Sequence, residues 1–388
     1  MTDRNQSHKS KRPSTAIWMA GALLSLASCS APDAGAAPLS EEALAAVAND
    51  AGAPKEQLAR AVDELFTAEG LGETRAVVVM ANGAIAAERY GDGYDANTRF
   101  ISWSMAKTMT AVLIGMLVAD GKLNVKEPAP VPLWQRPGDP RADITLEHLL
   151  QMRSGLRHTE AGDPPFESSE VRMLFLDGRD DMARWAKEQP MEAEAGEKFE
   201  YSSNTTVILA DIAARALTKS DDPDVRRAAI TDFLEERLFG PLEMTSMVPE
   251  FDASGTLIGG SLVHASARDY AKFGEFMRAG GRAPSGEQLV PSGWIEAMTA
   301  SSPASEHYGY QTWMNRAEPR LEYPHPLFPD RAPESLFALI GHMGQYVIIS
   351  PEQNITLVRL GHSTSEERPP MLQEVADVLA LYPASDKP

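Results

Sequence analysis

The spacing of apolar and polar positions divides the chain into three parts. Residues 75–80 and 84–90 have strand character and are joined by Asn82-Gly83, a pair that favours the tight turn of a β-hairpin. Strand character returns near the end of the chain, over 336–340, 345–350 and 355–360. Between these ends the apolar positions follow helical spacing.

The expected helices fill the middle of the chain and flank the strands. They cover 43–66, 144–150, 205–216, 230–239, 265–279 and 370–381. Strands at both ends with helices between them predict an α+β fold. In it an antiparallel sheet is built from both termini, is flanked by helices and carries an inserted all-helical lobe. Residues 158–200 are polar and contain proline, and we expect them to rim a cleft.

Composition narrows the class of protein. The 388 residues are 43% hydrophobic and 23% charged, which suits one large domain or two lobes around a cleft. The formal net charge of -19 argues against nucleic acid and anionic membrane surfaces as partners. The oligomeric state cannot be read from these features.

The first 29 residues look like an export signal. A basic start precedes the apolar run 16–27, which is too short to span a bilayer stably, and Leu26-Ala27-Ser28-Cys29 ends it. This ending resembles a bacterial lipobox, which implies a lipid anchor on Cys29, and Ser30 resembles the outer-membrane sorting pattern. The alternatives are an ordinary secretory signal with an incidental cysteine, or an uncleaved anchor.

The expected organisation follows from that interpretation. Residues 1–28 form the signal peptide, residues 29–55 a flexible tether, and residues 56–388 the domain. The mature protein is expected to be an exported bacterial lipoprotein of the cell envelope that faces the periplasm and is anchored in the outer membrane. Cys29 is the single cysteine, so no internal disulfide is possible.

Ser104-Met105-Ala106-Lys107 is the only Ser-x-x-Lys in the chain, and it opens a long apolar helix. At i and i+3 the two side chains share one helix face. A serine hydroxyl needs a neighbour to take its proton, and a desolvated lysine with a lowered pKa could do so. The helix N-terminus adds N–H groups where negative charge develops. The alternative is a chance pair with a solvated Lys107.

Two further segments could complete such a site. Tyr201, in Tyr-Ser-Ser-Asn, could exchange protons with Lys107 and the leaving group, or could simply be packed at a helix entrance. His342 lies in Gly-His-Met-Gly-Gln, where backbone N–H groups could face that of Ser104, or it could be structural. Four aromatic residues could line a pocket or pack in the core: Trp134, Tyr308, Tyr310 and Trp313.

Together these motifs resemble the serine β-lactamase/penicillin-binding superfamily over roughly residues 60–385. Arg153-Ser154-Gly155-Leu156 and Gly259-Gly260-Ser261 fit the same pattern. The resemblance is to the branch that contains class C β-lactamases, family VIII carboxylesterases and 6-aminohexanoate-dimer hydrolases, and it implies a β-lactamase-like fold.

The resemblance also implies roles. Ser104 would be the acylated nucleophile, Lys107 its proton acceptor and Tyr201 the relay to the leaving group, while the N–H groups of Ser104 and Gln345 would form the oxyanion hole. The implied substrate and oxyanion positions are His342, Gly344, Gln345, Ser203 and Asn204.

Two departures from the family pattern bear on the substrate. Tyr-Ser-Ser stands where class C enzymes have Tyr-x-Asn, with the asparagine one place later at Asn204. His342 stands where they have a lysine, and a mostly neutral imidazole holds a β-lactam carboxylate less well.

We therefore expect an acyl-enzyme serine hydrolase acting on a small-molecule ester or amide. β-Lactamase or D,D-peptidase activity is an alternative, as is a catalytically silent, lipid-tethered envelope binding protein. The chain has no Gly-x-Ser-x-Gly, His-Glu-x-x-His or dinucleotide fingerprint, and we expect no cofactor and no metal.

Overall fold

The two ends of the chain build one sheet. In the computed structural model, which describes residues 38–317 and 326–384, six antiparallel strands pair in the order β2-β1-β9-β8-β7-β6. Their bounds are β1 Glu73–Ala81, β2 Ala84–Tyr90, β6 Trp313–Met314, β7 Phe337–Gly341, β8 Gln345–Ser350 and β9 Ile355–His362. Asn82 and Gly83 make the β1–β2 turn with φ of 52° and 82°, the left-handed region that this pair tolerates.

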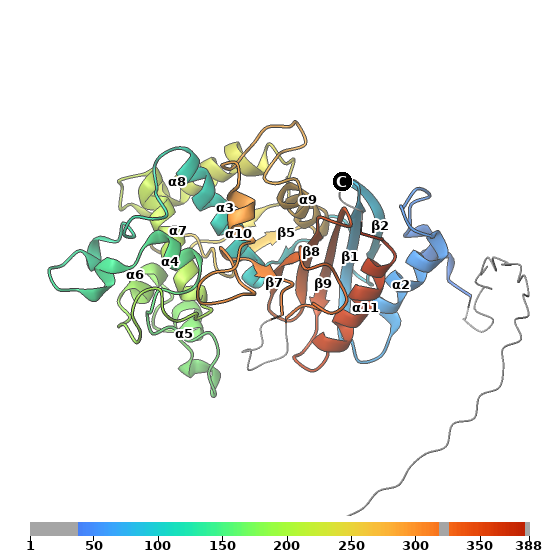
Figure 1. The fold of residues 1–388 in the computed structure, drawn as a ribbon, viewed down its shortest axis with the longest axis horizontal. Coiled ribbons are helices and arrows are strands. Elements are labelled where there is room, and N and C mark those ends of the chain that lie inside the picture. The colour runs from blue at the N-terminus through green and yellow to red at the C-terminus, as the bar shows by residue number, and fades with distance from the viewer. Residues whose placement is uncertain (1–37, 318–325, 385–388) are drawn as a thin grey trace, which may run out of the picture. The chain divides into compact units, whose positions relative to one another are not determined.

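Each face of the sheet is covered by helices (Figure 1). Val77 and Val79 of β1 pack in a core with α2 (Lys55–Thr67) and α11 (Arg368–Ala380). The alternate residues Ala76 and Val78 point to the other face and join the core that contains α9 (Ala267–Arg278). This alternation is the period of two that a strand imposes.

The helical lobe is inserted between β2 and β6. Its α-helices are α3 Ala106–Ala119, α4 Leu146–Leu150, α5 Ser169–Phe175, α6 Met182–Lys187, α7 Ser203–Leu217, α8 Pro223–Leu234 and α10 Trp294–Met298. Shorter pieces are the 3-10 helices η1 Trp103–Met105, η2 Pro132–Trp134, η3 Pro140–Asp143 and η4 Pro165–Glu167, and a π-helical turn η5 Glu235–Phe239. A small second sheet has the order β3-β5-β4, with bounds Phe100–Ile101, Val263–Ala265 and Val248–Pro249.

The sheet built from both termini, with helices on both faces and an inserted helical lobe, is the architecture expected from the sequence. The first helix is different: 43–66 is interrupted, with α1 at Glu41–Ala45 and α2 beginning only at Lys55. Gly52 has a φ of 75°, and Pro54 lies directly before α2, where its fixed φ suits a helix start.

The expected tether over 29–55 is corrected in its second half. Ala43, Val47 and Ala51 are buried, and the compact unit begins at Leu39. Ala48 N–H donates to Ala86 O at 2.9 Å and Glu88 N–H donates to Ala46 O at 2.8 Å. This segment therefore extends the sheet beside β2 and covers its edge.

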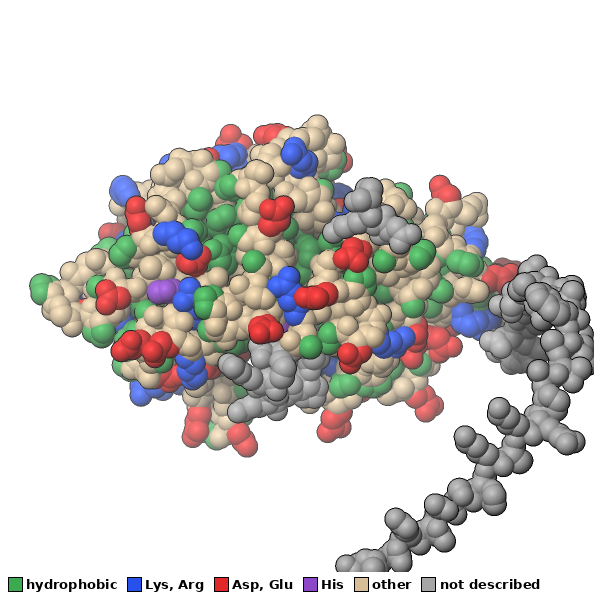
Figure 2. Space-filling view, in the orientation of Figure 1, with side chains coloured by type: hydrophobic (Ala, Val, Ile, Leu, Met, Phe, Trp, Pro, Cys, Tyr) green, Lys and Arg blue, Asp and Glu red, His purple; other side chains and the backbone are tan. Residues whose placement is uncertain are grey.

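The signal peptide over 1–28 and the lipidation site Cys29 lie outside the described residues. Among the residues that are described, no helix is long and apolar enough to cross a membrane. On the face drawn in Figure 2, acidic side chains are spread over the lobe and the sheet, with basic side chains between them.

Helix α3 lies at the centre of the lobe and is buried from Ala106 to Leu117. An apolar helix without a polar face is expected to be buried on all sides. Gly115 lets the indole of Trp294 on α10 pack directly on the α3 backbone, because a Cβ there would lie 2.4 Å from Trp294 Nε1. The contact matters for the site because α3 begins two residues after Ser104.

We predict that Gly115→Ala lowers the free energy of unfolding by about 1 kcal/mol or more. Overpacking costs about 1–3 kcal/mol, and the better helix propensity of alanine returns only about 0.5–1 kcal/mol. Urea unfolding of Gly115→Ala, Trp294→Ala and the double variant measures this. In the Trp294→Ala background, Gly115→Ala should leave the free energy of unfolding unchanged or raise it. If the changes in the free energy of unfolding of the two single variants simply add in the double variant, Gly115 and Trp294 are not in contact.

Candidate active site

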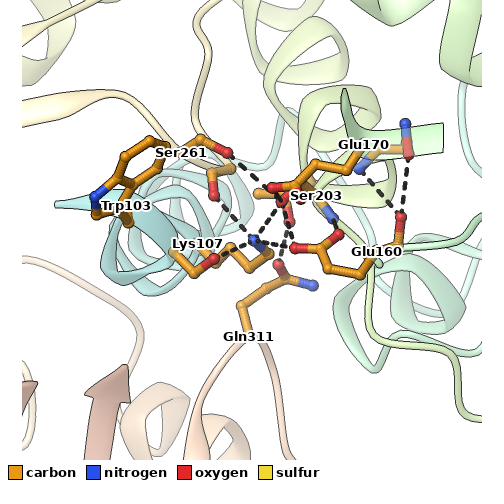
Figure 3. Close-up of polar contacts among 12 residues, drawn as sticks. Trp103, Lys107, Glu160, Glu170, Ser203, Ser261 and Gln311 are labelled. Carbon is orange, nitrogen blue, oxygen red and sulfur yellow. Dashed lines mark hydrogen bonds and ion pairs between the residues drawn. The ribbon is translucent and has the colours of Figure 1, made fainter. Parts of the chain in front are cut away.

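Lys107 is the centre of a buried polar network (Figure 3). Its side chain is 1% exposed, and its ammonium donates to Ser104 Oγ at 2.9 Å, to Ser203 Oγ at 2.7 Å and to Gly260 O at 2.9 Å. An ammonium has three N–H donors, so these partners use all of them. The network joins η1, α3, the start of α7 and the Gly259–Ser261 loop.

Ser104 and Ser203 both contact Lys107 but differ in access. Ser104 is partly exposed and lines a cleft, whereas Ser203 is fully buried at 0% exposure and does not belong to the cleft wall formed by the described residues. Of the two serines, Ser104 is the one that is open to the cleft.

The residue before Ser104 has a strained backbone. Trp103 has a φ of 43°, which is unusual for a bulky side chain. Such strain persists only where the surroundings enforce it, and it is concentrated at functional sites. Here the ring of Trp103 packs edge-on against His342, with centroids 5.5 Å apart. Ser104 is thereby presented at the start of α3, beside the end of β7.

Two carboxylates lie behind the lysine. Glu160 Oε1 is 3.5 Å from Lys107 Nζ, and Ser203 donates to this carboxylate twice, from its backbone N–H at 2.6 Å and from Oγ at 2.7 Å. Glu170 Oε1 lies 3.1 Å from the same Ser203 Oγ. Burial and the charge of Glu160 raise the pKa of Glu170 to about 7, against the opposing effect of Lys107.

The pKa of Lys107 moves in the direction opposite to the one expected from the sequence. Burial lowers it, but the electrostatic influence of Tyr201, Glu160 and Glu170 is larger in sum and leaves the pKa raised. Lys107 is therefore an ammonium at neutral pH. The sequence showed the lysine and its helix, but not the acids that face it.

Tyr201 stands next to this ammonium. Lys107 Nζ lies 4.8 Å from the centroid of the Tyr201 ring, which also packs against Tyr308 and Trp313. Burial raises the pKa of Tyr201, and Lys107 and a hydrogen bond with Ser104 oppose this only in part. Its hydroxyl is therefore protonated at neutral pH and close to both members of the Ser-x-x-Lys pair.

Only some of the residues expected at the cleft from the turn after β7 line it in the structure. Among the described residues that line the cleft, the turn contributes Gly341 and His342 but neither Gly344 nor Gln345. The amide of Gln345 is turned inward and donates to His342 O, Met343 O and Gly361 O. Gly341 packs tightly on the segment before Ser104, since a Cβ there would lie 2.4 Å from Ser102 O.

Asn204 also lies away from the lysine. It is fully buried, and its amide donates to Ser169 O and Met173 Sδ, so it joins α7 to α5. Its neighbour Ser203 is the one that faces Lys107. Of the four aromatic residues singled out from the sequence, Trp313 lines the cleft, while Trp134, Tyr308 and Tyr310 are buried outside its wall as far as the described residues show.

The sequence of the whole domain matches one known family. Residues 59–380 match the family described as Beta-lactamase. The chain belongs to the beta-lactamase family. The contact of Lys107 with a serine hydroxyl is consistent with the acylating serine of a serine hydrolase in this family.

Individual relatives of this beta-lactamase-family chain are distant. It is 25% identical over 303 residues to a 6-aminohexanoate-dimer hydrolase of Paenarthrobacter ureafaciens, covering 74% of this chain and 72% of the relative. A Bacillus anthracis structure provisionally named as a 6-aminohexanoate-dimer hydrolase has a TM-score of 0.64 at 21% identity and covers 83% of both chains. A family VIII carboxylesterase has a TM-score of 0.58 at 14% identity, covering 83% of this chain and 97% of its own. The two structures show a shared fold.

Sequence reasoning missed Glu160 and Glu170. Both lie inside 158–200, the region expected to rim the cleft, but nothing in their spacing distinguishes them from the many other acids of this family member. Within the described residues, no three His, Cys, Asp or Glu side chains are grouped so that they could hold a metal ion.

The cleft wall also carries charge. Its acidic side chains, among the described residues, are Glu160, Glu170, Glu197, Glu200, Glu306 and Asp330, and its basic ones are Lys198, Arg331 and Arg368. Burial and the charge of Arg368 lower the pKa of His342, and Glu160 opposes this. His342 is therefore a neutral imidazole above its lowered pKa.

We predict that Arg368→Gln raises the pKa of His342, because the variant removes the nearby positive charge. NMR titration of the imidazole signals measures this shift. His264, which pairs with Glu250 on another part of the surface, serves as the control whose signal should not move between the two proteins. An unchanged His342 titration would contradict the electrostatic contact across the cleft.

Proposed function

We propose that the chain hydrolyses a small ester or amide through an acyl-enzyme on Ser104. The observation that carries the proposal is that Ser104 both accepts a hydrogen bond from Lys107 at 2.9 Å and lines the cleft. Ser203 also contacts Lys107, but it is fully buried and does not reach the cleft as the described residues form it. A nucleophile must meet its substrate, so access supports Ser104.

The steps follow from the neighbours of Ser104. As Ser104 Oγ bonds to the carbonyl carbon, its proton passes to Lys107, and this ammonium at the same time gives one of its own protons to a hydrogen-bond partner. Tyr201, protonated and next to Lys107, donates a proton to the departing alcohol or amine and is reprotonated from the lysine. Water then attacks the acyl-enzyme by the reverse proton path and frees Ser104.

The negative oxygen of the tetrahedral intermediate needs N–H donors. We infer that they come from the backbone at Ser104 and from the Gly341–His342 segment, which lines the cleft, rather than from Gln345. The close packing of Gly341 on Ser102 supports this choice, because it brings the end of β7 beside η1. Preorganised donors of this kind lower the barrier by several kcal/mol.

The charges around Ser104 favour a substrate without a carboxylate near the scissile bond. His342 is neutral where a fixed cation would be needed, and Glu160 lies close to Lys107. The name of the Paenarthrobacter ureafaciens relative suggests a short amide, and that of the carboxylesterase structure an ester. A β-lactam or D-amino-acid peptide is the second candidate, supported by the family match and by Arg368 on the cleft wall.

We predict that Ser104→Ala abolishes turnover of a p-nitrophenyl short-chain ester and the acyl adduct seen by intact-mass spectrometry. The matched variant Ser203→Ala should still form an adduct at Ser104, since its hydroxyl is not the nucleophile. An adduct that persists in Ser104→Ala and disappears in Ser203→Ala would assign the nucleophile to Ser203. A panel of amide dimers and β-lactams then separates the substrate classes.

We predict that Lys107→Ala and Tyr201→Phe each lower the acylation rate by on the order of 10³-fold or more, because groups that act as a unit fail together. Stopped-flow release of p-nitrophenol measures the step. The control is Tyr308→Phe, which changes a buried hydroxyl beside the Tyr201 ring and should leave acylation within a few fold. Near-normal acylation in Tyr201→Phe would refute the role given to its hydroxyl.

We also propose that Cys29 carries a lipid that anchors the domain to the cell envelope, on the basis of Leu26-Ala27-Ser28-Cys29 after a basic and apolar start. Cys29→Ser should abolish incorporation of labelled palmitate in a bacterial host, whereas Ser30→Ala should retain it. Palmitate labelling of Cys29→Ser equal to the wild type would disprove the anchor.

A further inference from the structure

Neither of the described side chains that hydrogen-bond to Ser104 is a free base at rest. Lys107 uses its three N–H donors on Ser104, Ser203 and Gly260, and its pKa is raised. Tyr201 is the other neighbour, and its raised pKa keeps its proton in place. An ammonium can accept the proton of Ser104 only if it releases one of its own. The acceptor of that second proton must therefore touch Lys107.

The hydroxyl of Ser203 connects the lysine to two carboxyls. It accepts from Lys107 Nζ at 2.7 Å, lies 2.7 Å from Glu160 Oε1 and lies 3.1 Å from Glu170 Oε1. A hydroxyl has a single proton and can donate it to one of the two at a time. Together with the contact between Lys107 and Ser104 Oγ, the arrangement is a continuous path of hydrogen-bonding groups to a pair of carboxyls. Figure 3 shows the part of the path that joins Lys107, Ser203, Glu160 and Glu170.

The two carboxyls are held in place by the protein rather than by chance contact. Glu170 N–H donates to Thr159 O at 3.1 Å, and Thr159 Oγ1 accepts from Ser169 N–H at 2.9 Å, so the chain before Glu160 is fastened to the start of α5. Beside it, His158 is buried between Thr205 Oγ1 and Ala186 O, each at 3.1 Å. Glu160 itself accepts from the first N–H of α7, where the helix dipole favours negative charge.

We propose that Glu160 and Glu170 are the terminal acceptor of the proton that Ser104 loses on acylation, with Lys107 and the hydroxyl of Ser203 as the relay. This inference rests on the proposed acyl-enzyme at Ser104. As Ser104 Oγ bonds to the carbonyl carbon, its proton moves to Lys107 Nζ. Lys107 passes one of its own to Ser203 Oγ, and Ser203 passes its hydroxyl proton to a carboxylate oxygen. Lys107 stays an ammonium, and one carboxylate becomes a carboxylic acid at the tetrahedral intermediate. When the leaving group departs with the proton of Tyr201, this acid returns its proton through Ser203 and Lys107 to Tyr201.

Glu170 and Glu160 have different surroundings, and we assign them different roles in the relay. Glu170, partly buried and next to another carboxylate, has a pKa of about 7 and can take up or release a proton near neutral pH. Glu160, which accepts both Ser203 bonds and faces Lys107, positions Ser203. The charged and titratable groups that face the pair come from three elements: Lys107 on α3, Tyr201 before α7 and His342 after β7. In this set of five described groups, Glu160 and Glu170 are the two carboxyls, so they are the groups that can accept a proton as carboxylates.

The experiment is the pH dependence of acylation, measured as the burst of p-nitrophenol from pH 5 to 9. The carboxylate form accepts the proton, so the wild-type rate should rise with pH through about 7. Glu170→Gln should lose this rise and acylate on the order of 10²-fold more slowly at pH 8. Glu56→Gln, an exposed acid on α2 that does not line the cleft, is the matched control and should keep the wild-type profile.

Ser203 tests the relay separately from the acid. Ser203→Ala should slow acylation as Glu170→Gln does, whereas Ser203→Thr keeps a hydroxyl and should restore most of the rate. A role in folding alone would not give this pattern together with a changed pH profile. Glu170→Gln with an unchanged rate and an unchanged rise near pH 7 would overturn the relay while leaving the acyl-enzyme intact. A wild type that forms no adduct would overturn the proposed function, and the relay with it.

A second readout needs no turnover. In protein labelled with ¹³C at the glutamate carboxyls, one signal should titrate near pH 7 and be absent from Glu170→Gln. In Lys107→Met the same signal should titrate at still higher pH, because Lys107 lowers the pKa of Glu170. A Glu170 signal with an ordinary pKa would overturn the relay.

Discussion

The site depends on one buried ammonium. Lys107 is almost fully excluded from water, and a charge in that position is tolerable only when it is hydrogen-bonded and faced by opposite charge. Its three hydrogen-bond acceptors and the nearby Glu160 meet that requirement. The same contacts orient Ser104, order the start of α7 and fix the Gly259–Ser261 loop. Removing the positive charge would leave the two partly buried carboxyls of Glu160 and Glu170 next to each other without it, so the stability of this region and its chemistry have a common origin.

The fold was largely predictable because its signals are local. The Asn82-Gly83 turn and the strand runs near the C-terminus act over a few residues, and the structure has both of them. The break between α1 and α2 was missed because helical spacing continued through it. The pairing of residues 46–48 with β2 was not predictable, since an edge contact leaves no period in the sequence.

The candidate site was predictable only where its members form motifs. Ser104 and Lys107 are three residues apart, and Tyr201 and His342 lie in recognisable segments. Glu160 and Glu170 have no such signature, and their relation to Lys107 comes from the fastening of the Thr159 segment to α5. The direction of the Lys107 pKa was wrong for the same reason: burial could be expected from the apolar helix, whereas the opposing acids come from fifty or more residues away. Gly344 and Gln345 were expected at the cleft together with His342, and among the described residues they do not line it.

The pairing of β1 with β9 joins residues nearly 300 positions apart, and the site is assembled from both sides of that pair. Ser104 and Lys107 follow the first hairpin, the tyrosine and the acids belong to the inserted lobe, and His342 lies in the turn between β7 and β8. A chain still being synthesised thus has its nucleophile and lysine long before β7 exists. A nascent or incompletely folded copy has no assembled site, so any hydrolytic activity would report that synthesis and folding are complete.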